Sequence, residues 1–438
     1  MNDLANKREL SAEDRPAASN AEALPHVAFY LYHFNDIDQS TPIMWKFLER
    51  GHKVTTVLLD PQLSHDNDPR FRLLKTYPGF DIKSVTDVIP VPGAGWLFRQ
   101  KNGMTTGRLR RLLRKVLRET GLTVQMAETG IRAIGAKVCV FEWGGLGARN
   151  RTECLLAAQR LGLRTATVPQ GANIFLNVEV NKTVAEAVRR GEKPRQDYNA
   201  YDAYIFQNPI HRDAQVKLGM DPDMCRVIGS PRYCQEWLAI HDTLYPPFQP
   251  KHDCADKTKL VFVLQQWIYN IDQEATLAAI QRLYEQDWIY LIVKDHPRSD
   301  LGALPKDLRA KIAERTNAEV IGAEVSSTSL MNWSDAVINF ASSIAIEPIV
   351  KGKPVINPRY LHANATAFDD PGVTICVNSD AELIDAAGRL RTEKMDGLSG
   401  PARDNFLQTV VHGGHNPVDV LQGYYDVIVG NQNEQQYR

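Results

Sequence analysis

Three side chains that can carry a positive charge follow one apolar run in the second half of the chain. The run Ile289–Val293 is typical of a buried strand, and it leads directly to Lys294, His296 and Arg298. Lysine offers a point charge, arginine a planar fork and histidine a hydrogen-bond donor, so the three side chains suit a phosphate group. A solvated basic turn after a strand explains the same residues equally well.

A turn rich in hydroxyl groups follows the strand-like run that ends at Phe340. Ser342 and Ser343 open an expected helix, and Glu347 lies four residues beyond Ser343. A helix start offers backbone N–H groups and the positive end of the dipole to an anion, and an acidic residue can accept ribose hydroxyls. Ordinary capping is the alternative for the serines. Because both motifs follow strands of one expected sheet, together they indicate a nucleotide-phosphate cradle.

These motifs resemble those of bacterial surface-polysaccharide glycosyltransferases of the GT-B fold. The matching segments are KDHPR (294–298), the serine pair with AIEPIVKGKPVI (345–356), and GSPRYCQEW (229–237), all within residues 225–360. The likeness is greatest to the group that uses CMP-Kdo or CDP-glycerol donors. It implies that four residues bind the phosphate of the donor: Lys294, His296, Ser342 and Ser343.

The same resemblance implies the reaction and its partners. The donor is a CMP-linked sugar such as CMP-Kdo, which is a co-substrate, so no cofactor is expected. The acceptor is a glycan or a lipid-linked glycan of capsule or lipopolysaccharide biosynthesis. No metal is expected, because the basic side chains can neutralise the phosphate themselves.

Two further residues are candidates for donor binding. Gln266 ends the first strand of the second half, where it should adjoin the base or the sugar. Arg232 lies near the expected hinge, where its fork can bind a phosphate. An interdomain salt bridge is the alternative for Arg232.

Three carboxylates in the first half are candidates for the catalytic acid or base. Asp36 and Asp38 follow the run His26–Tyr32, and Glu142 follows the run Lys137–Phe141. A carboxylate at such a strand end can act as a general base, or as a nucleophile if the transfer retains configuration. Turn and cap chemistry is the alternative for the two aspartates.

A carboxylate such as Glu142 at a buried strand end costs free energy unless it is paired or hydrogen-bonded. A salt bridge to Arg149 or Arg151 is the alternative to catalysis, and Gly144 and Gly145 beside it allow a close approach of the backbone to a sugar. The candidates for acceptor binding are Gln170, Asn173 and Arg149.

Short β-rich runs alternate with segments of helical period, which is typical of parallel α/β units. Such sheets bind ligands beyond the carboxyl ends of their strands. We therefore expect two Rossmann-like parallel-sheet domains that face each other across a cleft. The expected segments are a disordered tail (1–24), an acceptor domain (25–240), a linker (241–259), a nucleotide-donor domain (260–415), and a C-terminal helix and tail (416–438). The first helix is expected at Ser40–Arg50, with its start marked by Ser40, Thr41 and Pro42.

Composition and charge narrow the class of protein. The chain has 438 residues, 43% of them hydrophobic, with 51 basic and 52 acidic side chains. This balance argues against a protein that coats nucleic acid. Six scattered cysteines without a C-x-x-C pair fit a reducing cytoplasm, and no run is long enough to span a membrane.

One segment could still bring the chain to a membrane surface. Arg108–Arg118 places five apolar side chains on one helical stripe and six basic ones on the other face. A packed helix with a solvated basic face, an anionic membrane and a polyanionic glycan are all open. The protein is thus expected in the cytoplasm, with possible peripheral contact at the inner membrane.

The sequence favours a CMP-sugar-dependent glycosyltransferase and leaves three alternatives. One is a CDP-glycerol or polyol-phosphate transferase. Another is a UDP-N-acetylglucosamine 2-epimerase-like enzyme, which shares the fold, although Ser342-Ser343-Ile344 stands where its serine–glycine–glycine loop would be. The last is a non-catalytic subunit that binds a nucleotide sugar.

Overall fold

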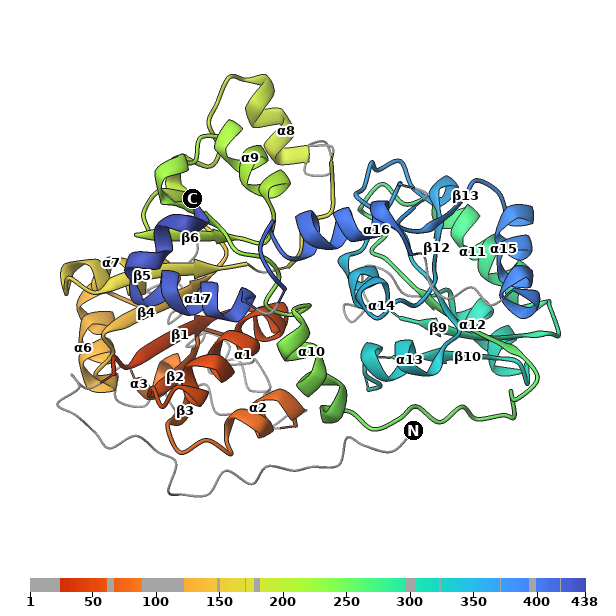
Figure 1. Cartoon of the computed structure of the whole chain (residues 1–438), viewed down its shortest axis with the longest axis horizontal. Coiled ribbons are helices and arrows are strands. Elements are labelled where there is room, and N and C mark those ends of the chain that lie inside the picture. Colours follow the sequence, from red (N-terminus) through yellow and green to blue (C-terminus); the bar gives the residue numbers. More distant parts are fainter. Residues whose placement is uncertain are drawn as a thin grey trace, which may run out of the picture.

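The chain forms two α/β domains beside each other (Figure 1). The computed structural model describes residues 24–60, 67–88, 122–147, 150–169, 171–176, 182–295, 304–322, 324–370, 372–393, 399–417 and 419–438. The basic segment Arg108–Arg118 and all but the last residue of the expected tail lie outside these ranges. The two parallel-sheet domains expected from the sequence are confirmed.

The first sheet has seven parallel strands in the order β3-β2-β1-β4-β5-β6-β7. The order reverses between β1 and β4, which pair directly. Such a switch point is where α/β sheets open a crevice for ligands. The strands are β1 (Val27–Leu31), β2 (Val54–Leu58), β3 (Phe80–Ser84), β4 (Val138–Glu142), β5 (Arg164–Val168), β6 (Ala203–Phe206) and β7 (Cys225–Val227).

The second sheet has six parallel strands in the order β10-β9-β8-β11-β12-β13, with its own switch point between β8 and β11. Edge strands β3 and β13 were not expected, because FDIKS is half polar and ICV is only three residues long. The strands are β8 (Thr258–Val263), β9 (Ile289–Lys294), β10 (Ala318–Ile321), β11 (Ala336–Ile338), β12 (Val355–Pro358) and β13 (Ile375–Val377).

Helices cover both sheets (Figure 1). In the first domain they are α1 (Phe34–Glu49), α2 (Pro69–Leu74), α3 (Val85–Val88), α6 (Val124–Ile134), α7 (Arg151–Arg160), α8 (Lys182–Arg189), α9 (Pro209–Lys217) and α10 (Gln235–His241). In the second they are α11 (Gln273–Tyr284), α12 (Lys306–Ala313), α13 (Ser327–Trp333), α14 (Ile346–Val350) and α15 (Asp380–Thr392), followed by α16 (Pro401–Phe406) and α17 (Val420–Val429).

The start of α1 differs from the expectation. The helix begins at Phe34, six residues before Ser40, and Pro42 lies inside it. The cap comes from Asp36, whose carboxylate accepts hydrogen bonds from the backbone N–H groups of His33 and Tyr32. Because this cap fixes the helix start early, the prediction of a start at Ser40 was wrong. Asp36 and Asp38 therefore lie on a helix and not in a loop.

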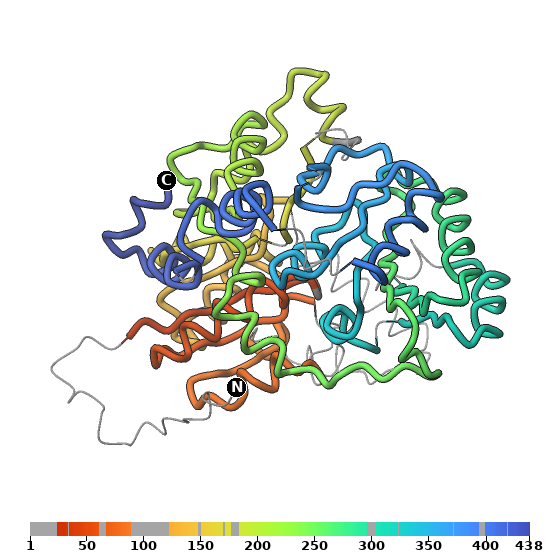
Figure 2. Tube along the Cα trace, turned by 45° about the vertical axis from the view of Figure 1, so that its right-hand side comes forward, coloured from red at the N-terminus to blue at the C-terminus, as the bar shows by residue number. Residues whose placement is uncertain are grey.

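The C-terminal segment returns to the first domain. In both views the dark blue chain end lies over the first sheet (Figures 1 and 2). Val420, Leu421, Tyr424 and Val427 of α17 are buried in one apolar core with strands β1 and β4. The expected amphipathic segment at 417–429 thus completes the core of the first domain.

All six cysteines are free, and five of them are buried. Among the described residues, no helix combines the length and the apolarity that crossing a bilayer requires.

We predict that α17 is required for the stability of the first domain. Leu421→Ala should lower the free energy of unfolding by about 2–5 kcal/mol, because it leaves a cavity in a fully buried core. Urea unfolding measures this change, and hydrogen exchange should show faster opening of β1 and β4. The control is Leu176→Ala at a side chain that is 53% exposed, where the change should stay within about 0.5 kcal/mol. Equal stability of the two variants would contradict the packing of α17.

Candidate active site

Loops from the carboxyl ends of both sheets meet at the junction between the domains. After β5, Phe175 forms an antiparallel bridge with Thr366 of the second domain. After β7, the Tyr233 hydroxyl donates a hydrogen bond to the backbone oxygen of Ser343, at 3.1 Å. One apolar cluster at the junction joins Ile174 and Tyr233 to Ile346 and Phe406. The loops after β5 and β7 therefore contact the second domain at one junction.

Asp36 and Glu142 come together at the switch point of the first sheet. They reach it from α1 and from the end of β4, and they are only 1% and 2% exposed. The backbone N–H of Tyr32 donates to both, at 3.1 Å to Asp36 Oδ2 and at 3.2 Å to Glu142 Oε2. Two of the three carboxylates predicted from the sequence thus form one pair.

This pair favours a bound proton. Burial, followed by the hydrogen bond and the charge of Asp36, raises the pKa of Glu142 far above its usual range. Asp36 Oδ1 is buried and accepts no hydrogen bond from the described residues. A proton shared by the two carboxyl groups accounts for both observations, because two buried like charges this close do not both ionise. Burial and the neighbouring Asp36 thus favour the protonated form of Glu142.

Arg151 supplies a partial counter-charge from the first turn of α7. Its guanidinium donates to Glu142 Oε1 at 3.3 Å and to the backbone oxygens of Trp143 and Gly145. Gly144 leaves room for that guanidinium, since a Cβ there would lie 2.1 Å from Arg151 Nη1. The glycine therefore admits an arginine, and the expectation that it admits a sugar lacks support here. Arg149 lies outside the described residues.

Asp38 has a different environment from Asp36, although the two are spaced as Asp-x-Asp. On a helix that spacing turns the carboxylates to different faces. Asp38 forms ion pairs with Arg70 and with Arg232, the latter at 2.7 Å. Asp38 therefore belongs to an ion-pair network and is separate from the Asp36–Glu142 pair. The salt bridge of Arg232 lies within the first domain.

Several residues expected to bind the donor lie at the switch point of the second sheet. The Gln265 side chain donates to Asn339, and Asn339 donates to the backbone oxygen of Ser342 at 2.9 Å. Ser342 caps a short 3₁₀ turn through Ile344 N at 3.5 Å, which is the alternative expected for it. Gln266 is buried beside this network.

Lys294 is buried at the end of β9. Its ammonium donates to the backbone oxygens of Gly322 and Val325 in the loop after β10. Burial lowers the pKa of Lys294 to about 8. The lysine thus secures a loop at the expected phosphate site, and its contact with phosphate stays a prediction. His296, Arg298 and Gln170 lie outside the described residues, while Asn173 accepts a hydrogen bond from the N–H of Phe175.

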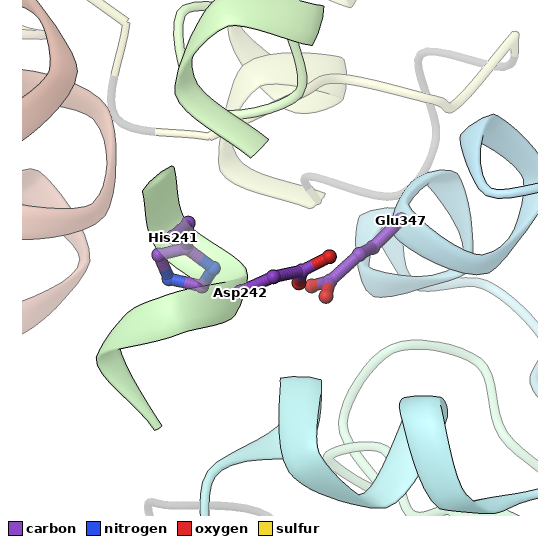
Figure 3. A group of neighbouring side chains, drawn as sticks. All are labelled: His241, Asp242 and Glu347. Carbon is purple, nitrogen blue, oxygen red and sulfur yellow. The ribbon is translucent and has the colours of Figure 1, made fainter. Parts of the chain in front are cut away.

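Glu347 is fully buried on α14 and faces the first domain. Its carboxylate and that of Asp242 point toward each other (Figure 3), and together with His241 they place their ligand-type atoms within 4.8 Å of one another. The Lys351 ammonium lies 2.5 Å from Asp242 and 3.0 Å from Glu347. Lys351 thus already brings a positive charge to both carboxylates. The expectation of metal-independent chemistry stays a prediction.

Sequence reasoning missed Tyr233 and Lys351 as contacts between the domains. Tyr233 lies inside the GSPRYCQEW segment, and Lys351 is four residues after Glu347. That helical spacing is a usable signal for an ion pair. The pairing of Lys351 with Asp242 joins segments 109 positions apart, which no local pattern reveals.

We predict that Glu142 makes stability depend on pH. The native state keeps a proton that the unfolded state loses above a pH of about 4.5. The unfolded state therefore becomes more stable relative to the native state as pH rises. The free energy of unfolding should fall by up to about 1.4 kcal/mol per pH unit. In Glu142→Gln this component should disappear in urea titrations between pH 5 and 8. Exposed Glu274→Gln is the matched control, and a wild-type slope that persists in Glu142→Gln would refute the shared proton.

Comparisons with known proteins give a fold and no family. No family model and no curated protein matches the sequence. A structure described as a UDP-N-acetylglucosamine 2-epimerase from Listeria monocytogenes has a TM-score of 0.56 at 13% identity, over 92% of this chain and 96% of its own. The Neisseria meningitidis UDP-GlcNAc 2-epimerase bound to UDP-GlcNAc gives 0.52 at 12%, over 93% and 100%. The S. aureus MnaA–UDP structure gives 0.50 at 12%, over 93% and 99%.

At this identity the likeness shows the fold alone. It agrees with the two switch points and with the meeting of strand ends from both sheets. The narrower resemblance to Kdo transferases stays a prediction. The chain therefore has the GT-B fold, with two Rossmann-like domains on either side of a shared junction.

Proposed function

We propose that the chain is an enzyme that acts on a nucleotide sugar. The observation that carries this proposal is the buried Asp36–Glu142 pair at the strand-order switch point of the first sheet. A pair that holds one proton can accept a proton from a sugar and return one to it. The second domain would hold the nucleotide phosphate at the loops that carry Lys294, His296 and the serine pair.

Structural similarity supports a UDP-sugar as the first candidate substrate. The structures compared above include a UDP-GlcNAc 2-epimerase bound to UDP-GlcNAc and the MnaA structure with UDP, and each aligns with more than nine-tenths of this chain. Epimerisation at a carbon needs a group that removes a proton and a group that returns one, which a carboxyl pair can supply. The departure at Ser342-Ser343-Ile344 from the serine–glycine–glycine loop counts against this candidate.

The motifs support a CMP-sugar glycosyltransferase as the second candidate. Here the pair would remove the proton of the acceptor hydroxyl while the nucleotide phosphate leaves toward the basic loop. CMP-Kdo is the donor that the KDHP and serine motifs suggest. A CDP-glycerol transferase would use the same phosphate cradle.

We predict that one nucleotide stabilises the chain selectively. In a thermal-shift series with CMP, CDP, UDP, GDP and ADP, a ligand at about a hundred times its Kd should add roughly 2.7 kcal/mol. A preference for UDP would support the epimerase-like candidate, and a preference for CMP or CDP the transferase. His296→Ala should lose the shift if His296 binds the phosphate. No response to any nucleotide would contradict the proposal and favour a non-catalytic role.

The same preparation separates chemistry from binding. With UDP-GlcNAc or with CMP-Kdo plus an acceptor glycan, Glu142→Gln should lose about 10²–10⁴-fold of turnover and keep its nucleotide shift. Exposed Glu274→Gln is the control that should keep both. Full turnover in Glu142→Gln and in Asp36→Asn would show that the pair serves the structure alone.

A peripheral contact with an anionic membrane is a separate proposal, carried by the basic face of Arg108–Arg118. Basic side chains near an anionic surface contribute about 1 kcal/mol each. Changing Arg110, Arg111, Arg114 and Lys115 to Gln should therefore remove most of the flotation with anionic liposomes. Neutral liposomes are the control, and unchanged flotation of the variant would refute the contact.

A further inference from the structure

One oxygen of Glu347 is bonded and the other is left open. Oε1 accepts a hydrogen bond from Lys351 Nζ at 3.0 Å, while Oε2 is buried and accepts none from the described residues. The whole side chain is 0% exposed. A buried carboxylate oxygen without a donor is costly, so this oxygen is suited to a donor that a ligand brings.

Lys351 fixes the orientation of that carboxylate. Its ammonium donates to Glu347 Oε1, to Asp242 Oδ1 at 2.5 Å and to Asn332 Oδ1 at 3.0 Å. These three acceptors match the three hydrogens that an ammonium offers. With its ammonium held at three points, Lys351 limits the rotation of the Glu347 carboxylate and leaves Oε2 as the free acceptor.

The anchor of Lys351 comes from the other domain. Asp242 directly follows α10, whose Trp237 and Ile240 pack in the core of the first domain. Asn332 and Glu347 lie on α13 and α14 of the second domain. Figure 3 shows the Asp242 and Glu347 side chains approaching each other from these two sides. The orientation of Glu347 therefore depends on a residue outside its own domain.

We propose that Lys351 is a positioning residue for ribose recognition, which holds one oxygen of Glu347 so that the other accepts a ribose hydroxyl, and that Asp242 anchors it from the opposite domain. This inference rests on the proposed function, because it takes the nucleotide to lie beside the Ser342–Glu347 segment. Removing Lys351 would leave the buried Glu347 carboxylate without its cation and without the hydrogen bond that fixes its orientation. Removing the Asp242 charge would loosen the same arrangement from across the junction.

The consequence is a coupling between the sugar of the nucleotide and the contact between the domains. If Asp242 improves the binding of a ribose hydroxyl, the bound hydroxyl strengthens the Asp242–Lys351 contact by the same factor. A ribonucleotide should therefore hold the domains together more firmly than its deoxy counterpart.

The test compares ribose discrimination across four variants. The probes are the nucleotide that gives the largest thermal shift and its 2′-deoxy and 3′-deoxy counterparts, with Kd measured by titration calorimetry on the full chain. Wild type should bind the ribonucleotide roughly tenfold or more tightly than at least one deoxy form, as a hydrogen bond to a charged group implies. We call the Kd for the deoxy form divided by the Kd for the ribonucleotide the ribose ratio. Glu347→Gln and Lys351→Met should reduce the ribose ratio to near one, and Asp242→Asn should reduce it in part.

Lys353→Met is the matched control. Lys353 lies two residues from Lys351, and its ammonium donates to the backbone oxygens of Asn332 and Ser334 within one domain. Its loss can lower stability and should leave the ribose ratio unchanged. A purely structural role for Lys351 would likewise leave the ratio unchanged, so the ratio separates positioning from stability.

The outcomes distinguish this inference from the proposed function. If wild type binds a nucleotide with ribose discrimination that persists in Lys351→Met and Asp242→Asn, the inference fails and the function stands. Equal binding of ribo and deoxy forms by wild type also overturns the inference alone. If wild type binds no nucleotide, both fail. Asp242→Asn leaves the residues Lys351 and Glu347 themselves unchanged, so it tests the inference even if Lys351→Met does not fold.

Discussion

Two carboxyl groups buried side by side at the β1/β4 switch point are the constraint on which the first domain depends. Burying both as anions would cost several kcal/mol each, so the surrounding chain must supply compensation. Tyr32 N–H donates to both groups, and Arg151 reaches Glu142 from α7. Asp36 at the same time caps α1. The start of α1, the room at Gly144 and the proton on the pair thus follow from one buried contact.

The junction between the domains combines such compensated charges with apolar packing. Asp38 pairs with Arg70 and Arg232 on one side, and Lys351 links Asp242 to Glu347 on the other. The segment that joins α16 to α17 packs against the GSPR segment, where a Cβ on Gly229 would meet the His412 backbone at 2.9 Å. A substrate at this junction would meet charges already fixed in place, which is how preorganised sites stabilise developing charge at low cost.

The sequence predicted the strands better than the contacts between them. Apolar runs such as Ile289–Val293 match the observed strands, because a strand buried on both faces needs little beyond hydrophobicity. Glu142 and Asp36 could be singled out as strand-end acids. Their pairing, however, requires β1 and β4 to be adjacent strands, which the sequence does not reveal. The prediction for α1 failed because Ser40, Thr41 and Pro42 resemble a helix start, while the true start is capped by Asp36, whose carboxylate accepts from the His33 N–H three residues before it.

The burial that raises the pKa of Glu142 also limits what can reach it. At 1% and 2% exposure, Asp36 and Glu142 can touch a sugar only after nearby chain segments move. Admitting water would reduce the desolvation that holds the proton on Glu142, and closing around a substrate would restore it. An acid of this kind is most firmly protonated when the site is shut. Opening and proton transfer would therefore be linked through the same buried contact, and contacts across the domain junction would help to set that balance.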